Sequence, residues 1–223
     1  MKVAVLFSGG KDSCLALHKA KQAGHGVLYL LNIFPENVDS FMFHKPDMKL
    51  LKRQAEMLGI ELIVQKSKGV ENKELDELEL LIGSVKGKVE GIVAGGIGSN
   101  YQGDRVGKIC EKYGLELILP LWDYTADKLW DELIDLGFKI MITKISCEGL
   151  PKELLGKILD RRDFEALQKL SRKFKFRLDF EGGEAETSVL QMPGFKKEIK
   201  VSFNSESDGN YRYFIKNLKI TNS

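Results

Sequence analysis

The stretch KVAVLFSGGKDS, residues 2–13, decides the fold of this chain. Its apolar run, residues 3–7, is typical of a buried parallel strand. The run stops at Ser8-Gly9-Gly10, and a helical pattern follows over residues 11–23. The sequence therefore predicts a strand that turns through paired glycines into a helix, near the start of an α/β domain.

Such a turn suits an anion. It presents free backbone N–H groups and the positive end of a helix. Gly9 and Gly10 allow positive φ and close approach of the backbone, while Ser8 and Ser13 add hydroxyl groups and Lys11 adds a mobile positive charge. A plain turn before a solvated helix start is the alternative, but it leaves the combination of the two serines and the lysine unexplained. We therefore predict a phosphate-binding loop.

The motif differs from the common P-loop, GxxxxGK[ST], which is absent from the chain. Instead, SGGKDS resembles the PP-loop of the N-type ATP pyrophosphatase family. Members of that family cleave ATP between its α and β phosphates and adenylate a substrate. The resemblance implies that this chain binds ATP.

Composition narrows the class of protein. The 223 residues carry a formal net charge of +2, from 34 basic and 32 acidic side chains. This balance argues against nucleic acid as a partner, although it allows a local basic patch. No apolar run is long enough to span a bilayer, and the N-terminus lacks the form of a signal peptide. We therefore expect a soluble, cytoplasmic protein with no membrane partner; the sequence leaves open whether it forms a homo-oligomer.

The cysteines, Cys14, Cys110 and Cys147, are far apart and form no CxxC pair. This spacing predicts neither a zinc site nor a redox pair. Three buried, reduced thiols are the expected arrangement. Paired cysteines are frequent in PP-loop enzymes that transfer sulfur to tRNA, and they are missing here.

Strand-like apolar runs alternate with helical patterns as far as residue 145. The strand-like runs are Val27–Phe34, Glu61–Val64, Gly91–Ala94, Glu116–Leu119 and Lys139–Ile145, and the helical patterns are Asp47–Leu58, Asn72–Val85, Asn100–Tyr113 and Ala126–Leu136. This alternation predicts a doubly wound, mostly parallel sheet with right-handed crossovers. In such sheets ligands bind beyond the carboxyl ends of the strands. We expect the loops there to face one site.

The pattern changes near Gly149 and predicts a smaller α+β domain. Its predicted parts are a charged helix over 159–174, strand-like KFKFRLDF over 173–180, strand-like runs over 187–191, 199–203 and 211–215, and a hairpin turn at 207–210. We place the larger domain at residues 1–145 and the smaller one at 146–223.

Two further loops of the first domain are candidates for the nucleotide site. The segment GGIGSNYQ, residues 95–102, lies between a predicted strand and a predicted helix, and Arg105 falls on the same helix face as its last residues. A plain turn and a solvated face are the alternatives. The segment FMFH, residues 41–44, is aromatic although it follows a strand, so His44 is a candidate contact for ATP or substrate; a structural histidine is the other interpretation.

The segment EGGEAET, residues 181–187, places three carboxylates around two glycines. Strands disfavour glycine and clustered like charges, so a plain surface strand explains this segment poorly. Its carboxylates could bind Mg²⁺, an ammonium ion or a cationic substrate group. A solvated acidic turn is the alternative.

Taken in order, SGGKDS, MFH, GGIGSNYQ with a following Arg, PLW at 120–122 and EGGEAET resemble the diphthine–ammonia ligase family, in a short archaeal-type form. The resemblance covers nearly the whole chain. It implies an adenine-nucleotide alpha-hydrolase-like fold, ATP and Mg²⁺ as cofactors, and translation elongation factor 2 and ammonium as partners. The implied reaction amidates the carboxylate of diphthine through an acyl-adenylate and releases AMP and pyrophosphate.

The resemblance also implies residue roles. The pyrophosphate part of ATP would contact Ser8, Gly9, Gly10, Lys11, Asp12 and Ser13; the rest of the nucleotide site would include His44, Gly95, Gly96, Ile97, Tyr101, Gln102 and Arg105; and the substrate side would consist of Glu181, Gly182, Gly183, Glu184, Glu186 and Thr187. The candidate catalytic residues are Lys11, Asp12, Glu184 and Glu186, and Asp12 is also the candidate Mg²⁺ contact. As an alternative, Asp12 partners the helix dipole.

The chain departs from the family pattern in two places. Ala185 stands where an aromatic residue is more frequent, and Gln191-Met192 replaces a polar-Cys pair. Two other functions remain as alternatives: a PP-loop enzyme that adenylates a tRNA base, and a non-catalytic sensor that binds ATP. The first would predict a basic RNA-binding surface, and the second has no use for EGGEAET.

Overall fold

The computed structural model describes residues 1–35, 46–68, 74–96 and 100–221, with the side chains of residues 100–103 excepted. The chain forms two compact units. One comprises Met1–Ser8 and Asp12–Asp123, and the other comprises Gly9–Lys11 and Tyr124–Ser223. The second unit therefore begins earlier in the chain than the expected boundary after residue 145.

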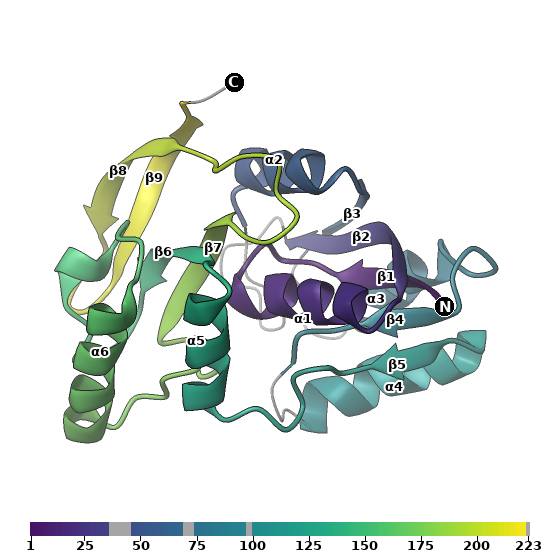
Figure 1. The fold of residues 1–223 in the computed structure, drawn as a ribbon, viewed down its shortest axis with the longest axis horizontal. Coiled ribbons are helices and arrows are strands. Elements are labelled where there is room, and N and C mark those ends of the chain that lie inside the picture. Colours follow the sequence, from purple (N-terminus) through teal and green to yellow (C-terminus); the bar gives the residue numbers. More distant parts are fainter. Residues whose placement is uncertain (36–45, 69–73, 97–99, 222–223) are drawn as a thin grey trace. The chain divides into compact units, whose positions relative to one another are not determined.

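The first unit is built on a five-stranded parallel sheet with the order β3-β2-β1-β4-β5 (Figure 1). Its elements are β1 (Lys2–Leu6), α1 (Lys11–Gln22), β2 (Gly26–Pro35), α2 (Met48–Leu58), β3 (Glu61–Ser67), α3 (Glu74–Gly83), β4 (Gly91–Val93), α4 (Asn100–Tyr113) and β5 (Glu116–Ile118). The strand order reverses between β1 and β4, which is the doubly wound arrangement that the alternating sequence predicts.

The core of this unit forms where helices cover the sheet. Leu78 and Ile82 of α3 and Ile109 of α4 pack against Leu31 and Ile92 of the sheet, and all five are less than one-tenth exposed. Figure 1 shows α1 on the opposite side of the sheet from α3. Because both faces are covered, the central strands are apolar throughout rather than alternating.

Helix boundaries follow local chemistry. Asp47 caps α2, since its side chain accepts hydrogen bonds from the backbone N–H groups of Lys49 and Leu50. The helix ends at Gly59, whose φ of 66° is in the left-handed region. In α6 (Arg161–Phe174), Asp160 and Asp163 form a reciprocal capping box. These signals explain why the predicted and observed helices agree closely.

The second unit contains an antiparallel sheet with the order β7-β6-β9-β8. Its elements are α5 (Ala126–Asp135), β6 (Lys139–Ile145), a 3₁₀ turn (Lys152–Leu154), α6 (Arg161–Phe174), β7 (Ala185–Gln191), β8 (Val201–Ser207) and β9 (Tyr213–Ile220). The hairpin turn predicted near residues 207–210 connects β8 to β9, as expected.

Two predicted elements need correction. The strand-like run 139–145 was predicted to extend the parallel sheet, but it forms β6 of the antiparallel sheet, because its partners are β7 and β9. Pattern alone does not reveal the partner of an apolar run. KFKFRLDF does not form a strand: α6 extends to Phe174, and residues 175–184 form turns. The apolar alternation of this segment includes Phe176 and Phe180, which are buried although they lie outside any strand.

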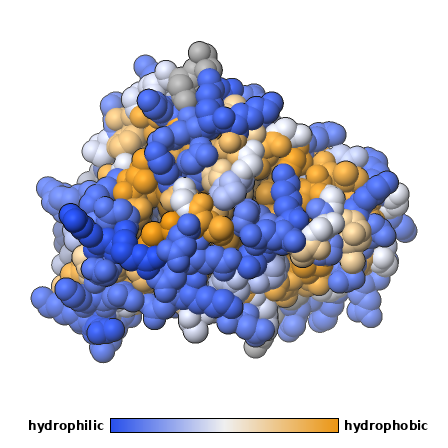
Figure 2. All heavy atoms as spheres, in the orientation of Figure 1, coloured by the Kyte–Doolittle hydropathy of each residue, from blue (hydrophilic) through white to orange (hydrophobic). Residues whose placement is uncertain are grey.

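The face drawn in Figure 2 is largely hydrophilic, with apolar residues between the hydrophilic ones. Large exposed apolar side chains of the described residues are scattered over several elements, as in Leu80, Ile158 and Tyr211. Isolated residues of this kind are ordinary on a protein surface. Among the described residues, none of the helices combines the length and apolar composition needed to cross a membrane.

Candidate active site

The phosphate loop begins where β1 leaves the sheet. Ser8 N–H donates to the Ser13 hydroxyl oxygen at 3.3 Å, and the two hydroxyl oxygens of Ser8 and Ser13 lie 3.1 Å apart. Gly9 has a φ of 74°, which a residue with a side chain rarely adopts. The first turn of α1 thus folds back on the loop that precedes it. The strand, turn and helix start that the motif predicts are therefore present, and anion binding by this loop stays a prediction.

The loop after β4 lies against the same helix start. A Cβ added to Gly95 would stand 2.7 Å from the backbone carbonyl carbon of Asp12 and 2.8 Å from the Ser13 nitrogen. Only glycine permits this approach, because backbone atoms have no room to move aside. Gly96 is different, since a Cβ there would meet no atom of the described residues within 4 Å. Two loops predicted separately from sequence are therefore adjacent.

One polar residue beside the loop is missing from the sequence prediction. Asn32 lies within β2 and is 5% exposed. Its side-chain Nδ2 donates to the Phe7 carbonyl oxygen at 2.8 Å. Its Oδ1 is buried and has no hydrogen-bond partner among the described residues. The available signal was a single amide in an otherwise apolar strand.

Residues Gly9–Lys11 belong to the second unit by their contacts. Gly9 carbonyl oxygen accepts from Val189 N–H at 3.0 Å, and Lys11 N–H donates to the Thr187 hydroxyl at 3.2 Å. Lys11 Nζ donates to the Asp179 carbonyl oxygen at 2.5 Å. The lysine is only 3% exposed. The expectation of a mobile, exposed charge at Lys11 is therefore wrong.

The segment that contains Asp179 is held in place by an ion pair and by a hydrogen bond from Trp130. Arg177 forms a two-point ion pair with Asp179, with nitrogen–oxygen distances of 2.9 and 2.7 Å. Burial alone would raise the pKa of Asp179, but the hydrogen bonds from Arg177 and from Glu181 N–H outweigh it and keep that pKa below its ordinary value. Trp130 of α5 donates to the Leu178 carbonyl at 2.7 Å. Asp179 therefore stays ionised while its carbonyl accepts from Lys11.

The acidic segment has cationic neighbours that the sequence did not reveal. Lys144 of β6 pairs with Glu186 at 2.9 Å. Glu184 Oε1 accepts from Arg177 N–H at 3.0 Å, while its Oε2 is buried without a hydrogen-bond partner among the described residues. Glu186 therefore has a balancing cation of its own in Lys144. A Cβ added at Gly182 would lie 2.5 Å from the Glu184 carboxylate, so a substitution there would displace the end of that flexible side chain.

The cysteine nearest this segment is Cys147. Burial, together with the negative charge of Glu184, raises the pKa of its thiol to about 11. Burial raises the pKa of the Cys110 thiol to about 11 as well, and that of Cys14 further still. All three cysteines are free thiols. None has the low thiol pKa of a nucleophile at neutral pH.

Several predicted site residues lie outside the part of the chain that the structure describes. His44 and Ile97 lie outside the described residues, as do the side chains of Tyr101 and Gln102. Arg105 is described and lies half-buried on α4. Among the residues that the structure describes, there is no group of three or more His, Cys, Asp or Glu side chains that could hold a metal ion. Coordination of Mg²⁺ by Asp12 therefore stays a prediction.

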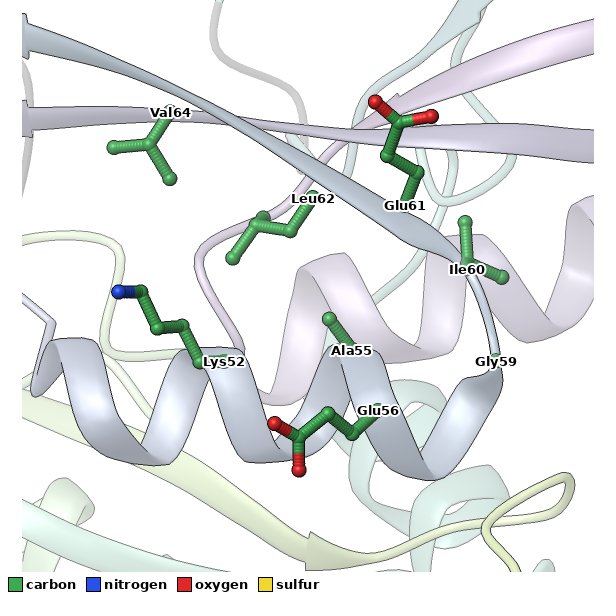
Figure 3. Close-up of a pocket in the computed structure, with 8 residues that line it drawn as sticks. All are labelled: Lys52, Ala55, Glu56, Gly59, Ile60, Glu61, Leu62 and Val64. Carbon is green, nitrogen blue, oxygen red and sulfur yellow. The ribbon is translucent and has the colours of Figure 1, made fainter.

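A hollow of about 420 Å³ lies elsewhere in the first unit, between α2 and β3 (Figure 3). Figure 3 shows Leu62 and Val64 above it and Lys52 and Ala55 below it, with Gly59 at one end. None of the predicted site residues lines it. It is a surface groove beside an edge strand, separate from the phosphate loop.

Known sequences match both units. A sequence model described as the diphthamide synthase N-terminal domain matches residues 1–117, and one described as the diphthamide synthase C-terminal domain matches residues 125–220. The chain belongs to the diphthamide synthase family. The two matches fall within the two units of the fold, except that Gly9–Lys11 groups with the second unit.

Curated relatives in this family share the name diphthine–ammonia ligase. The protein from Homo sapiens is 35% identical over 90% of this chain and 83% of its own length. The protein from Danio rerio is 32% identical over 89% of this chain and 86% of its own length. A likeness to a solved structure, the predicted subunit of a tRNA methyltransferase from Methanocaldococcus jannaschii, is distant, with 18% identity, coverage of 89% of this chain and 100% of that chain, and a TM-score of 0.46.

The residues present in this chain fit a bound ATP. The close approach of Gly95 to the start of α1 and the positive φ of Gly9 leave backbone N–H groups at the loop without side-chain bulk. Asn32 Oδ1, which has no hydrogen-bond partner among the described residues, lies beside the same loop. Both features are as expected for a site that is completed by a nucleotide.

Proposed function

We propose that this chain catalyses the last step of diphthamide synthesis, the ATP-dependent amidation of diphthine on translation elongation factor 2 with ammonium. The observation that carries the proposal is the match of both units to diphthamide synthase domains, with SGGKDS forming the loop of the first strand–helix turn. Family membership implies use of ATP. The partner protein, the nitrogen source and a cytoplasmic location are part of the proposal.

The chemistry has two steps. A carboxylate oxygen of diphthine attacks the α-phosphorus of ATP, the bond from that phosphorus to the bridging oxygen of the β-phosphate breaks, and pyrophosphate leaves. Ammonia, formed by loss of a proton from ammonium, then attacks the acyl carbon, loses a second proton and displaces AMP. No residue of the chain has to act as a covalent nucleophile, because positioning and electrostatic stabilisation supply most of the catalysis.

The phosphate loop would stabilise the departing pyrophosphate. In the first step negative charge builds on the bridging oxygen, where loop N–H groups and the Ser8 and Ser13 hydroxyls offer donors. Lys11 Nζ already donates to the Asp179 carbonyl. An ammonium group has three donors, so Lys11 can keep this bond and contact a phosphate as well. Mg²⁺, which we propose binds with ATP near Asp12, would supply further neutralisation of phosphate charge.

The acidic segment would hold the acceptor. Diphthine carries a fixed positive charge on its trimethylammonium group, and carboxylates attract such a cation. Glu184 Oε2 is the strongest candidate, since it is buried without a hydrogen-bond partner among the described residues. A trimethylammonium group cannot donate an N–H bond, so its contact would be electrostatic only. Glu186 is already neutralised by Lys144 and would act more weakly.

The decisive experiment follows the nucleotide products. The protein is incubated with ATP, Mg²⁺ and ammonium, together with elongation factor 2 that bears diphthine, and AMP, ADP and pyrophosphate are quantified. We expect AMP and pyrophosphate in equal amounts with the amidated factor. The matched control is the same factor without diphthine, which should give no turnover. ADP as the main product, or turnover with tRNA in place of the factor, would contradict the proposal.

A further inference from the structure

The side chain of Asn32 in β2 makes a hydrogen bond at the point where the neighbouring strand, β1, ends. The last paired residues of β1 and β2 are Leu6 and Leu31, and Phe7 N–H still donates to the Leu31 carbonyl at 2.8 Å. The Phe7 carbonyl is the acceptor that the next step of a parallel ladder would use. Here it accepts from Asn32 Nδ2 at 2.8 Å. The amide thus fixes the point at which the chain turns from β1 into the phosphate loop.

This hydrogen bond also determines which way the amide faces. A carbonyl oxygen can only accept, so the group 2.8 Å from it must be the NH₂ of Asn32 and not its oxygen. The Oδ1 atom therefore lies on the other side of the amide. There it is buried, in a residue 5% exposed, with no hydrogen-bond partner among the described residues.

A buried acceptor with no donor is costly and rare in native proteins. At this position an apolar residue would continue β2 without that cost, because the neighbouring strand residues Leu30, Leu31 and Ile33 are all buried. The hydrogen bond of Nδ2 does not remove the free-energy cost of burying Oδ1 without a donor. The cost disappears once a ligand supplies an N–H or O–H group.

We infer that Asn32 is a positioning residue of the nucleotide site: Nδ2 sets the start of the phosphate loop, and Oδ1 accepts a hydrogen bond from the nucleoside part of ATP. The inference rests on the proposed function only in taking ATP as the ligand. The phosphates are excluded as partners, because their oxygens are acceptors and cannot donate to Oδ1. The donors of ATP are the adenine amino group and the ribose hydroxyls.

The place of Asn32 in the fold agrees with this assignment. In doubly wound sheets ligands lie beyond the carboxyl ends of the strands, close to the point where the strand order reverses. Asn32 is adjacent to the carboxyl end of β1, and β1 is the strand at which the order reverses. Its partner Phe7 directly precedes Ser8, the first residue of the phosphate loop.

The first test needs no variant. Equilibrium binding to the intact protein, without elongation factor, is compared for ATP, 2′-deoxy-ATP, 3′-deoxy-ATP and purine riboside triphosphate, which lacks the amino group. Loss of one hydrogen bond predicts about tenfold weaker binding for the one analogue that lacks the donor to Oδ1. The analogue affected identifies the donor as the amino group or as one ribose hydroxyl. Equal affinity for all four nucleotides would overturn the assignment of Oδ1.

The second test combines variants of Asn32 with the nucleotide analogue that lacks the donor. Asn32→Ala should weaken ATP about tenfold, yet lose nothing further with the affected analogue, because the bond is already gone. Asn32→Asp keeps an acceptor but sets an oxygen against the Phe7 carbonyl. Both variants should therefore speed amide hydrogen exchange at residues 8–13 in the nucleotide-free protein. Asn204→Ala, at an exposed asparagine in β8, is the matched control and should change neither measurement.

The outcomes separate this inference from the proposed function. If Asn32→Ala lowers the melting temperature but leaves ATP affinity and hydrogen exchange unchanged, the residue is structural and the inference is wrong. If it weakens every nucleotide equally, a bound water occupies Oδ1 and the nucleoside contact is wrong. Failure of the proposed function would instead appear as ADP among the products, with the analogue preference intact.

Discussion

The phosphate loop and the acidic segment are both functional candidates, yet they are held in different ways. The loop is positioned mainly by backbone: the positive φ of Gly9, the close approach of Gly95 and the Asn32 bond to the Phe7 carbonyl. The acidic segment is positioned by charged side chains, through Arg177 with Asp179 and Lys144 with Glu186. The loop should therefore tolerate changes of surface charge. The acidic segment should tolerate added side-chain bulk except at Gly183, whose φ of 81° favours glycine.

Lys11 belongs to the phosphate loop and also bonds Thr187 and the Asp179 carbonyl. Its substitution should have the largest effect on turnover. Lys11→Ala removes charge stabilisation of the leaving pyrophosphate, so turnover should fall about 10²-fold or more, with a smaller loss of ATP affinity. Because Lys11 is buried and bonded to the Asp179 carbonyl, the variant should also melt at a lower temperature. Lys108→Ala, at an exposed position in α4, is the control and should change neither value. Normal turnover by the Lys11→Ala variant would mean that the loop is structural.

The loop could be predicted from sequence because its determinants are local. Strand, paired glycines, hydroxyls and helix start fall within residues 2–13, so no distant partner is needed to recognise them. The doubly wound sheet followed from the same local alternation. Gly95 was found because it repeats the pattern of strand, glycines and helix. Asn32 was missed because its importance comes from the Phe7 carbonyl, a backbone atom that carries no sequence signal.

The acidic segment was predicted only in part because its partners are remote in sequence. Lys144 reaches Glu186 through the pairing of β6 with β7, and β6 itself was assigned to the wrong sheet. Residues 175–180 resemble a strand in sequence because apolar and charged side chains alternate there. In the structure Phe176 and Phe180 are buried without forming a strand. Phe180 in fact has a φ of 61°, a strained value for a residue with a side chain. Such conformations depend on tertiary contacts, here with Trp130.

A second prediction tests the charges of the acidic segment. Glu184→Gln removes the negative charge while keeping the size of the side chain, and its amide can no longer attract a trimethylammonium group. Amidation should fall about 10- to 100-fold, the range for losing an interaction with a charged group, while ATP affinity is kept. Glu186→Gln should have a smaller effect, since Lys144 already pairs with Glu186. Rates of amide formation and separate ATP binding would measure this.

The control for this pair is Glu165→Gln, at an exposed position in α6. Normal amidation by both the Glu184→Gln and the Glu186→Gln variants would contradict a role for the segment in holding the acceptor. Loss of ATP binding in the Glu184→Gln variant would show that Glu184 contributes to the nucleotide site and not to the acceptor site.

A third prediction compares two ion pairs within the second unit. Asp179 is 8% exposed and forms the two-point pair with Arg177. Asp179→Asn weakens this pair and should lower the free energy of unfolding by about 1.5 kcal/mol. Asp208→Asn disrupts an exposed pair with Arg212 at 3.8 Å and should cost less than about 0.5 kcal/mol. Denaturant unfolding of both variants measures the difference. Equal costs would show that burial does not strengthen the Asp179 pair.

The pH dependence of this difference has a defined sign. The pKa of Asp179 is lowered in the folded protein, so its charge stabilises the fold above the ordinary aspartate pKa. As the pH falls through the lowered pKa, the carboxylate is protonated and this contribution is lost. The stabilities of wild type and Asp179→Asn should therefore converge in acid and differ most near neutral pH. A gap that widens on acidification would contradict the assigned direction.

The smallest expected effect concerns two neighbouring glycines, and it tests whether backbone contacts alone position the loop. Gly95→Ala places a Cβ 2.7 Å from the Asp12 carbonyl carbon, and neither backbone can move aside without displacing the first turn of α1. ATP binding should weaken about fivefold, the equivalent of about 1 kcal/mol, at the low end of the cost of overpacking. Gly96→Ala adds the same methyl group where no atom of the described part of the chain lies within 4 Å, so the affinity of this variant for ATP should be unchanged. Because the two variants differ only by one position, general effects of alanine on the loop cancel, and equal binding by both would mean that the contact between Gly95 and α1 does not set the nucleotide site.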